Sequence, residues 1–140
     1  MIEIKEVCEA NIDDIHGLAI LECTEYNIKL FIPRECIEKY VASAKDENVF
    51  ARVLVVQDVV IGFILIRKDL YIPSALIEQL FIHPKFRGST AFLRLLRMGE
   101  RWALEKECQL LFIGGIARLK KQDAFRLGYT EEHIYYAKEL

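Results

Sequence analysis

Apolar side chains follow two different spacings along the chain, and these spacings predict where strands and helices lie. Alternation of apolar and polar residues predicts a short first strand, in which Ile2 and Ile4 share one face. Later runs are rich in β-branched residues, and a polar break at Gln57-Asp58 separates two of them, which is typical of a hairpin. We therefore expect strands over residues 2–7, 49–57, 59–67, 75–82, 109–113 and 133–138.

Helical spacing of apolar residues predicts the remaining elements. One helix follows Asn11, whose side chain we expect to cap it, and the next begins after Pro33. A long amphipathic helix occupies about residues 89–107, with Trp102 on its apolar stripe, which we expect to pack in the core. A short helix occupies residues 120–127 and ends at Gly128.

The resulting order, βααβββαβαβ, defines an α/β protein with a mixed sheet flanked by helices. A chain of 140 residues fits one domain, residues 1–140. Apolar residues make up 53% of the chain and charged residues 29%, a balance that excludes general disorder. No apolar run reaches the roughly 18 residues of a membrane span, and the amino terminus lacks the apolar core of a signal peptide. We expect a cytoplasmic protein with no membrane partner.

The spacing of the cysteines and the distribution of charge limit the kinds of metal site and ligand that we expect. No CxxC pair is present, so we expect free thiols and no metal site at Cys8, Cys23, Cys36 and Cys108. The net charge of −2 argues against a nucleic-acid partner. The charge is uneven, because residues 85–121 hold nine Lys/Arg and only three Asp/Glu. Such a segment suits a compact anionic ligand, and solvated helix faces are the alternative.

The basic segment begins at a turn with the features of a phosphate site. A strand ending at Ile82 leads through Arg87-Gly88 directly into a helix. The first turn of a helix leaves about four N–H groups unpaired and carries partial positive charge. Gly88 lets the backbone approach a ligand closely. Ser89 or Thr90 adds a hydroxyl donor, and Arg87 adds charge. On its own, the pattern also fits an ordinary turn.

The same passage resembles the acyl-CoA-binding core of the Gcn5-related N-acetyltransferases, the GNAT superfamily. Residues 82–88 have the sequence IHPKFRG, and family members have a strand ending V-H-P-x-Y-R-G before a glycine-rich turn. Leu95-Leu96 matches the paired leucines of the following helix, and residues 125–129 (FRLGY) resemble a closing Y-x-K-L-G-F element. The element order matches too, so the resemblance covers essentially the whole chain and implies a mostly antiparallel GNAT sheet. More distantly, the turn resembles short GNAT-like proteins of tailed bacteriophages.

The resemblance implies an N-acyltransferase that moves an acetyl group from acetyl-CoA to a primary amine of a small molecule or protein. Backbone groups of Leu80, Phe81 and Ile82 would pair with the pantetheine arm. The pyrophosphate would lie against the turn and the first helical residues, which are Arg87, Gly88, Ser89, Thr90, Ala91, Phe92 and Leu93. Glu78 stands where some members place a carboxylate that accepts the amine proton. Family members are often dimers, so a homodimer is allowed here.

Two departures from the family pattern leave other functions open. Thr90 and Phe92 occupy signature positions of the turn, where Thr90 restricts the backbone and Phe92 adds bulk. The position of the family's general-acid tyrosine falls on Ala124, and the candidates to replace it are Tyr26, Tyr129 and Tyr135. The alternative function is therefore a catalytically inactive GNAT-fold module for binding or assembly, which the fainter resemblance to tailed-phage proteins would make phage-encoded. A nucleic-acid-binding domain is a third, weaker hypothesis.

Several candidate residues also have structural interpretations. Glu78 would instead pair with an Arg or Lys, because an unpartnered carboxylate on an apolar strand is costly to bury. His83 precedes Pro84, so we expect it to form a turn that faces solvent. The end of the first helix lies in the region that shapes acceptor sites in GNAT proteins, and it would attract a cationic acceptor through Glu22, Glu25 and Tyr26. An exposed helix end is the alternative there.

Overall fold

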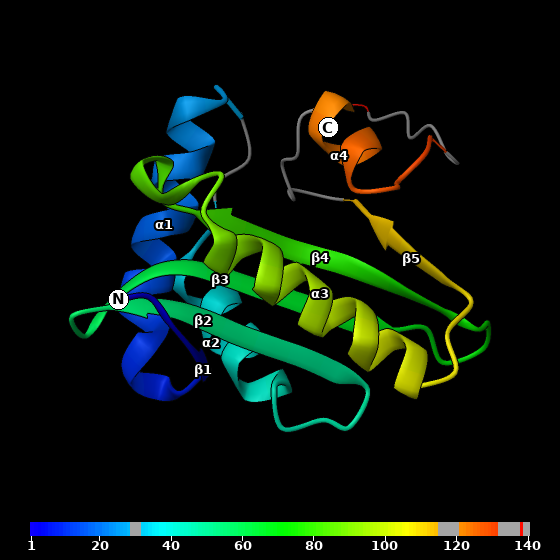
Figure 1. Ribbon diagram of the computed structural model, residues 1–140. Coiled ribbons are helices and arrows are strands. Elements are labelled where there is room, and N and C mark those ends of the chain that lie inside the picture. Colours follow the sequence, from blue (N-terminus) through cyan, green and yellow to red (C-terminus); the bar gives the residue numbers. More distant parts are fainter. Residues whose placement is uncertain (29–31, 115–120, 132–137, 139–140) are drawn as a thin grey trace.

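The computed structural model describes residues 1–28, 32–114, 121–131 and 138, and its elements follow the predicted order (Figure 1). The strands are β1 (Glu3–Glu6), β2 (Val49–Val56), β3 (Val59–Lys68), β4 (Ser74–Ile82) and β5 (Leu110–Ile113). The helices are α1 (Ile12–Glu25), α2 (Arg34–Ser43), α3 (Thr90–Glu105) and α4 (Lys121–Arg126), with 3₁₀ turns at Glu9–Asn11 and Pro84–Phe86. The last expected strand, residues 133–138, falls outside the described residues apart from Lys138, so it stays a prediction.

The five strands form one mixed sheet in the order β1-β2-β3-β4-β5. Neighbours from β1 to β4 are antiparallel, and β5 alone among the described strands runs parallel to its neighbour, β4. Gln57 and Asp58 both have positive φ and form the two-residue turn of the β2–β3 hairpin. The expected α/β class with a mixed, mostly antiparallel sheet is confirmed.

Helices cover both faces of the sheet (Figure 1). We call these the α1/α2 face and the α3 face. Phe63 and Phe81 are fully buried on the α1/α2 face, whereas Ile77 and Leu95 are fully buried on the α3 face. The expected apolar stripe of α3 is confirmed, and Trp102 completes it by packing 5.9 Å from the ring of Phe50.

Some local details depart from the sequence-based expectations and others confirm them. Asn11 stands at the start of α1, but its Oδ1 accepts a hydrogen bond from the Cys8 N–H at 2.8 Å and does not cap α1. Gly128 follows α4 with a φ of 92°, as expected for a residue that ends a helix. All four cysteines are free thiols. Among the described residues, no helix combines the length and apolarity needed to cross a membrane.

Candidate active site

The carboxyl-terminal half of β4 has an edge that no described strand occupies. β5 pairs with β4 only from Ser74 to Ile77. The Gly114 N–H follows the ladder with a contact to the Ile77 carbonyl at 3.4 Å. β4 itself continues to Ile82, and Figure 1 shows β5 diverging from it at that end. We call the unoccupied side of residues 78–82 the free edge of β4.

A β-bulge marks the point where the free edge begins. In the β3–β4 ladder, Ile66 pairs with Ile77 and Leu65 pairs with Gln79. Glu78 is therefore the extra residue on β4, opposite no single partner. Bulges bend a strand and re-aim its side chains, and they are common beside active sites. This bulge turns β4 at the residue that the sequence singles out as the proton acceptor.

Backbone direction determines which residues present hydrogen-bonding groups to the free edge. The His83 N–H donates to the Ile61 carbonyl of β3 at 2.8 Å. The direction in which backbone N–H and C=O groups point alternates from one residue of a strand to the next. The groups of Phe81, like those of His83, therefore point towards β3, and those of Leu80 and Ile82 point towards the free edge. The Ile82 carbonyl accepts a hydrogen bond from Arg87 Nε at 3.3 Å. The backbone groups of Leu80 and Ile82 thus face the free edge, whereas Phe81 contributes a fully buried ring.

The turn between β4 and α3 has open space beside its glycine. His83 forms the first part of the turn as expected, since its Nδ1 accepts a hydrogen bond from the Lys85 N–H at 3.2 Å. Gly88 has a φ of 77°, and a Cβ placed there would meet no atom within 4 Å. Ser89 caps α3, with its Oγ accepting from the Phe92 N–H at 3.2 Å. The cap uses the hydroxyl oxygen of Ser89 and leaves the hydroxyl hydrogen to donate to a ligand.

Among the first residues of α3, some side chains are exposed to solvent and others are buried in the core. Thr90 and Leu93 are exposed, whereas Ala91 is buried. Phe92 is half-buried and packs against the apolar core of the α3 face. The bulk of Phe92 therefore lies in contact with that core, while the backbone at the start of the helix remains that of an ordinary capped first turn.

Arg87 is bound to α1. Its Nη1 and Nη2 donate to the two carboxylate oxygens of Glu25 at 2.5 and 2.6 Å, and its guanidinium lies 5.5 Å from the centre of the Tyr26 ring. The hydrogen bonds to Glu25 raise the pKa of Arg87 above its usual value. Glu22, one turn earlier on α1, is only 4% exposed. The end of α1 is therefore packed against the turn after β4, and the alternative of an exposed helix end is wrong for Glu22.

A polar group lies on the α1/α2 face of β4 near the bulge. Glu78 Oε2 accepts a hydrogen bond from Arg67 Nε of β3 at 2.8 Å, which is the pairing that a structural role would also produce. Beside it, Gln79 Nε2 donates to Tyr40 Oη of α2 at 2.9 Å. Burial, and after it the negative charge of Glu78, raises the pKa of Tyr40.

Sequence reasoning identified Glu78 but missed the three residues around it. Tyr40 occupies an apolar position of α2, and Arg67 stands near the end of a β-branched strand, so neither pattern indicated a site. Gln79 did carry a signal, because it is an uncharged polar residue within an otherwise apolar part of β4. A polar residue at a position predicted to be buried could have been marked as a candidate.

Two of the three tyrosines proposed as replacements for the general acid fall within the described residues, and both contact groups other than Glu78. Tyr129 Oη donates to Glu100 Oε2 of α3 at 2.9 Å, and burial together with this bond raises the pKa of Tyr129. Tyr26 lies against Arg87. Tyr135 falls outside the described residues. Ala124 lies in α4, where its carbonyl accepts from the Tyr129 N–H at 2.9 Å. The tyrosine whose pKa responds to the Glu78 charge is Tyr40.

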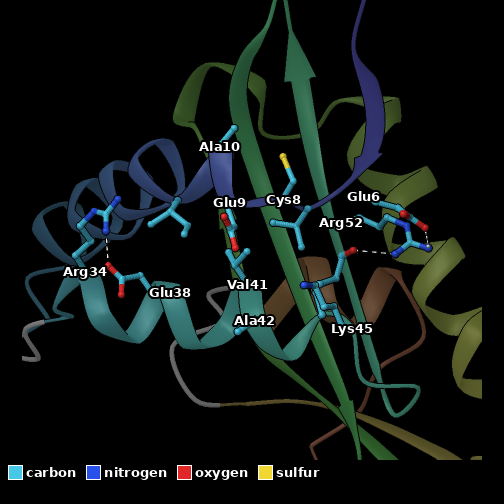
Figure 2. A pocket seen from close by; sticks show the side chains of 14 residues that line it. Glu6, Cys8, Glu9, Ala10, Arg34, Glu38, Val41, Ala42, Lys45 and Arg52 are labelled. Atoms are coloured by element: carbon cyan, nitrogen blue, oxygen red, sulfur yellow. Dashed lines mark hydrogen bonds and ion pairs between the residues drawn. The ribbon is translucent and has the colours of Figure 1, made fainter.

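A separate surface hollow lies at the opposite side of the sheet from β5, bordered by β1, β2 and α2 (Figure 2). Its volume is about 1290 Å³, and its rim is charged. The rim charges pair with one another, as Arg34 does with Glu38 and Arg52 with Glu6. The hollow includes none of the residues that the sequence assigned to the donor or to the amine.

Comparison with protein families identifies the class of this protein. The family model described as "Acetyltransferase (GNAT) family" matches residues 14–129. The chain therefore belongs to the GNAT acetyltransferase family, as its sequence resemblance and its fold both indicated. Membership makes it an acetyltransferase. Two structures with the same fold were solved with CoA and with acetyl-CoA. Family membership favours an enzyme over the non-catalytic module. No curated protein sequence matched the chain.

Several solved structures have the same fold at low sequence identity. A transcriptional regulator from Bacillus halodurans C-125 has a TM-score of 0.76 and 18% identity, with both chains covered fully. A predicted acetyltransferase with acetyl-CoA from Clostridium acetobutylicum has a TM-score of 0.79 and 11% identity over 99% of this chain and 96% of its own. The aminoglycoside acetyltransferase AAC(6')-Ih from Acinetobacter baumannii has a TM-score of 0.73 and 17% identity over 100% and 99%. At these identities the similarity establishes the fold.

Proposed function

We propose that this protein transfers the acetyl group of acetyl-CoA to a primary amine of a small molecule or protein. The observation that carries the proposal is the free edge of β4, which begins at the bulge of Glu78 and leads directly into the open turn at Gly88. A β-strand edge with unpaired backbone groups binds extended ligands by hydrogen bonding. A helix amino terminus binds phosphate. The two features adjoin in the order that an acyl-CoA requires.

The donor would be held by backbone groups more than by side chains. Leu80 offers its N–H and carbonyl to the pantetheine arm and Ile82 offers its N–H, while Phe81 between them pairs with β3 and holds the strand in place. The pyrophosphate would lie at the start of α3, against the N–H groups between Gly88 and Phe92 and the hydroxyl of Ser89. The exposed side chains of Thr90 and Leu93 flank this turn. Ala91 is small enough to leave it open.

Arg87 would add positive charge at the turn while holding the end of α1 through Glu25. This arrangement connects the two substrate sites. The turn that binds the donor is joined by an ion pair to the helix that borders the acceptor side of the sheet.

Glu78 would act as the proton acceptor for the amine. Acetyl-CoA supplies the acetyl group as an activated thioester. Glu78 takes a proton from the substrate ammonium, directly or through water, and the freed amine nitrogen bonds to the acyl carbon as the carbon–sulfur bond breaks. The sulfur leaves with one proton, so an ammonium and acetyl-CoA give an N-acetyl amide, CoA thiol and one released proton. Arg67 fixes the position of the Glu78 carboxylate.

The names of similar proteins support nitrogen as the acceptor atom. Aminoglycoside N-acetyltransferases and a ribosomal-protein-alanine N-acetyltransferase from Brucella melitensis share this fold. These names include both small-molecule and protein acceptors. For this chain the acceptor is therefore proposed at the level of a primary amine.

A thiol-release assay tests the proposal. Purified protein is incubated with acetyl-CoA and each member of a panel of primary amines, and free CoA thiol is measured with a chromogenic disulfide. We expect at least one amine to give turnover, and Glu78→Gln to lower kcat by about 10²–10⁴-fold, the range of general acid–base catalysis.

The matched control for this assay is Glu38→Gln, which removes another arginine-paired carboxylate, one that is exposed on α2 and bonded to Arg34. Glu38→Gln should leave turnover unchanged. Equal turnover in Glu78→Gln and the wild type would remove Glu78 from its role, and thiol release from no amine would contradict the proposed function.

A further inference from the structure

The α1/α2 face of the sheet contains a buried amide among apolar side chains. Gln79 is 3% exposed, and its partner across the ladder, Leu65, is 0% exposed. Phe63 and Phe81 lie in the same apolar core with 0% exposure. Burying an amide in such surroundings is costly unless both of its polar ends are hydrogen-bonded.

Only one end of the Gln79 amide has a hydrogen-bond partner within the described part of the chain. Nε2 donates to Tyr40 Oη at 2.9 Å, whereas Oε1 is buried and has no partner there. An unsatisfied buried acceptor in a folded protein calls for an explanation, and a missing ligand is one of the few available. The ligand that fits an amide oxygen is a hydrogen-bond donor.

Several observations place Gln79 and its partner Tyr40 beside Glu78, the proposed proton acceptor. Gln79 directly follows Glu78 at the bulge, where β5 leaves β4. The Tyr40 phenol that holds the Gln79 amide lies close enough to Glu78 for the carboxylate charge to raise the pKa of Tyr40. The other titratable groups whose charges influence the pKa of Tyr40 are Arg67 of β3 and Cys36 of α2. Arg67 is already bonded to Glu78.

We propose that Gln79, positioned by Tyr40, makes this enzyme specific for primary over N-methylated amines by accepting a hydrogen bond from the second N–H of the attacking nitrogen. This inference rests on the proposed function. A neutral primary amine has one lone pair and two N–H groups. The lone pair attacks the acyl carbon, one N–H faces Glu78, and the other faces Gln79 Oε1. An N-methyl amine has a single N–H, so it leaves the amide oxygen buried without a donor.

The test compares a primary amine with its N-methyl derivative. The substrate is the amine from the panel with the highest turnover, and kcat/KM is measured for both forms with wild-type protein and with Gln79→Met. Met has a similar length and volume but accepts no comparable hydrogen bond. We expect wild-type protein to prefer the primary amine by about tenfold or more, since a buried polar group left unpaired penalises the wrong substrate.

In Gln79→Met this preference should fall towards equality, mainly through a lower kcat/KM for the primary amine. Its melting temperature without ligand should be close to that of the wild type, because losing the unsatisfied amide oxygen offsets losing the hydrogen bond to Tyr40. Its stabilisation by acetyl-CoA should be unchanged. Tyr40→Phe, which frees the amide to rotate, should reduce the preference by a smaller factor.

The matched control is Leu65→Met, which makes a similar change directly across the ladder on the same face. It should leave the preference intact. A Gln79→Met protein that keeps the wild-type preference overturns the inference alone. A Gln79→Met protein that melts well below Leu65→Met also overturns it, since the amide would then be structural. If no amine gives turnover although acetyl-CoA stabilises the protein, the proposed function fails and the inference fails with it.

Discussion

The two halves of β4 differ in their surroundings. Residues 74–77 lie between β3 and β5 and form a closed part of the sheet. Residues 78–82 keep β3 as a neighbour, but their other edge has no described strand, and they contain both the bulge and the buried amide. Backbone groups left without partners reduce stability unless something else satisfies them. The comparison shows that this sheet is completed by protein in one half of the strand and, on our proposal, by ligand in the other.

The largest expected effect comes from the closed half. Ile77→Ala should lower the free energy of unfolding by about 2–5 kcal/mol, because it leaves a cavity in a well-packed core. Ile77 is 0% exposed, whereas Ile82 in the open half is partly exposed, so Ile82→Ala should cost less. Urea unfolding of both variants measures the difference. Equal losses would mean that the two halves are packed alike.

The next effect compares the turn at Gly88, which we propose binds the donor, with the turn at Gly128, which we expect to bind no ligand. Gly88 and Gly128 both have positive φ, and both have open space where a Cβ would lie. Changing either to Ala should lower stability by about 1–2 kcal/mol, the cost of placing an L-residue in the left-handed region. Only Gly88→Ala should also weaken acetyl-CoA binding, by about tenfold, or 1.4 kcal/mol. Calorimetric titration would detect it, and equal affinity in both variants would place the phosphates elsewhere.

A third variant tests whether Tyr129, which is bonded to Glu100 of α3, takes part in proton transfer. Tyr129→Phe removes the hydrogen bond to Glu100 and should cost about 1 kcal/mol at neutral pH. Turnover should be unchanged, because the Tyr129 phenol is held by α3. A large loss of turnover would instead identify Tyr129 as the general acid.

The same residue gives a pH dependence with a defined sign. Burial, followed by the bond to Glu100, raises the pKa of Tyr129 above the ordinary value of 10.0. The folded protein therefore holds the phenol proton of Tyr129 more tightly than the unfolded chain does. The resulting contribution of Tyr129 to the free energy of unfolding is complete below about pH 10 and is lost as the pH rises further. Urea unfolding on both sides of this pH should show a smaller alkaline loss in Tyr129→Phe than in the wild type. Identical slopes would contradict the assignment.

The smallest effect concerns the ion pair between Arg87 and Glu25. Its side chains are 32% and 37% exposed, and a pair in contact with solvent contributes at most about 1 kcal/mol. Glu25→Gln should therefore change stability little. It should strengthen acetyl-CoA binding, because Arg87 is released towards the phosphates, whereas Arg87→Met should weaken it. If both variants shift the affinity in the same direction, Arg87 acts through α1 alone.

Most of the fold was predictable because local patterns determine it. Alternating and helical spacings placed the ends of β2, β4 and α3 within about two residues, and the family-like passage at residues 82–88 placed the turn. The cap at Asn11 was predicted incorrectly. The Asn11 side chain instead accepts a hydrogen bond from the Cys8 N–H, next to the 3₁₀ turn at Glu9–Asn11. The spacing of apolar residues gave no sign of this turn.

The site was only partly predictable because its contacts join distant parts of the chain. The bulge at Glu78 depends on the register between β3 and β4, which the sequence of one strand does not specify. Gln79 and Tyr40 are 39 residues apart, and Arg87 and Glu25 are 62 apart. Only packing of α1 and α2 on the sheet brings these pairs together.

The most direct test of the central claim is amide NMR of ¹⁵N-labelled protein titrated with acetyl-CoA. The claim is that the free edge of β4 and the first turn of α3 bind the donor. The largest shifts should then occur at Leu80, Ile82 and residues 88–92, with small shifts at Ala75 and Leu76 in the closed half. Shifts centred on the hollow beside α2, or none at saturating acetyl-CoA, would contradict the account.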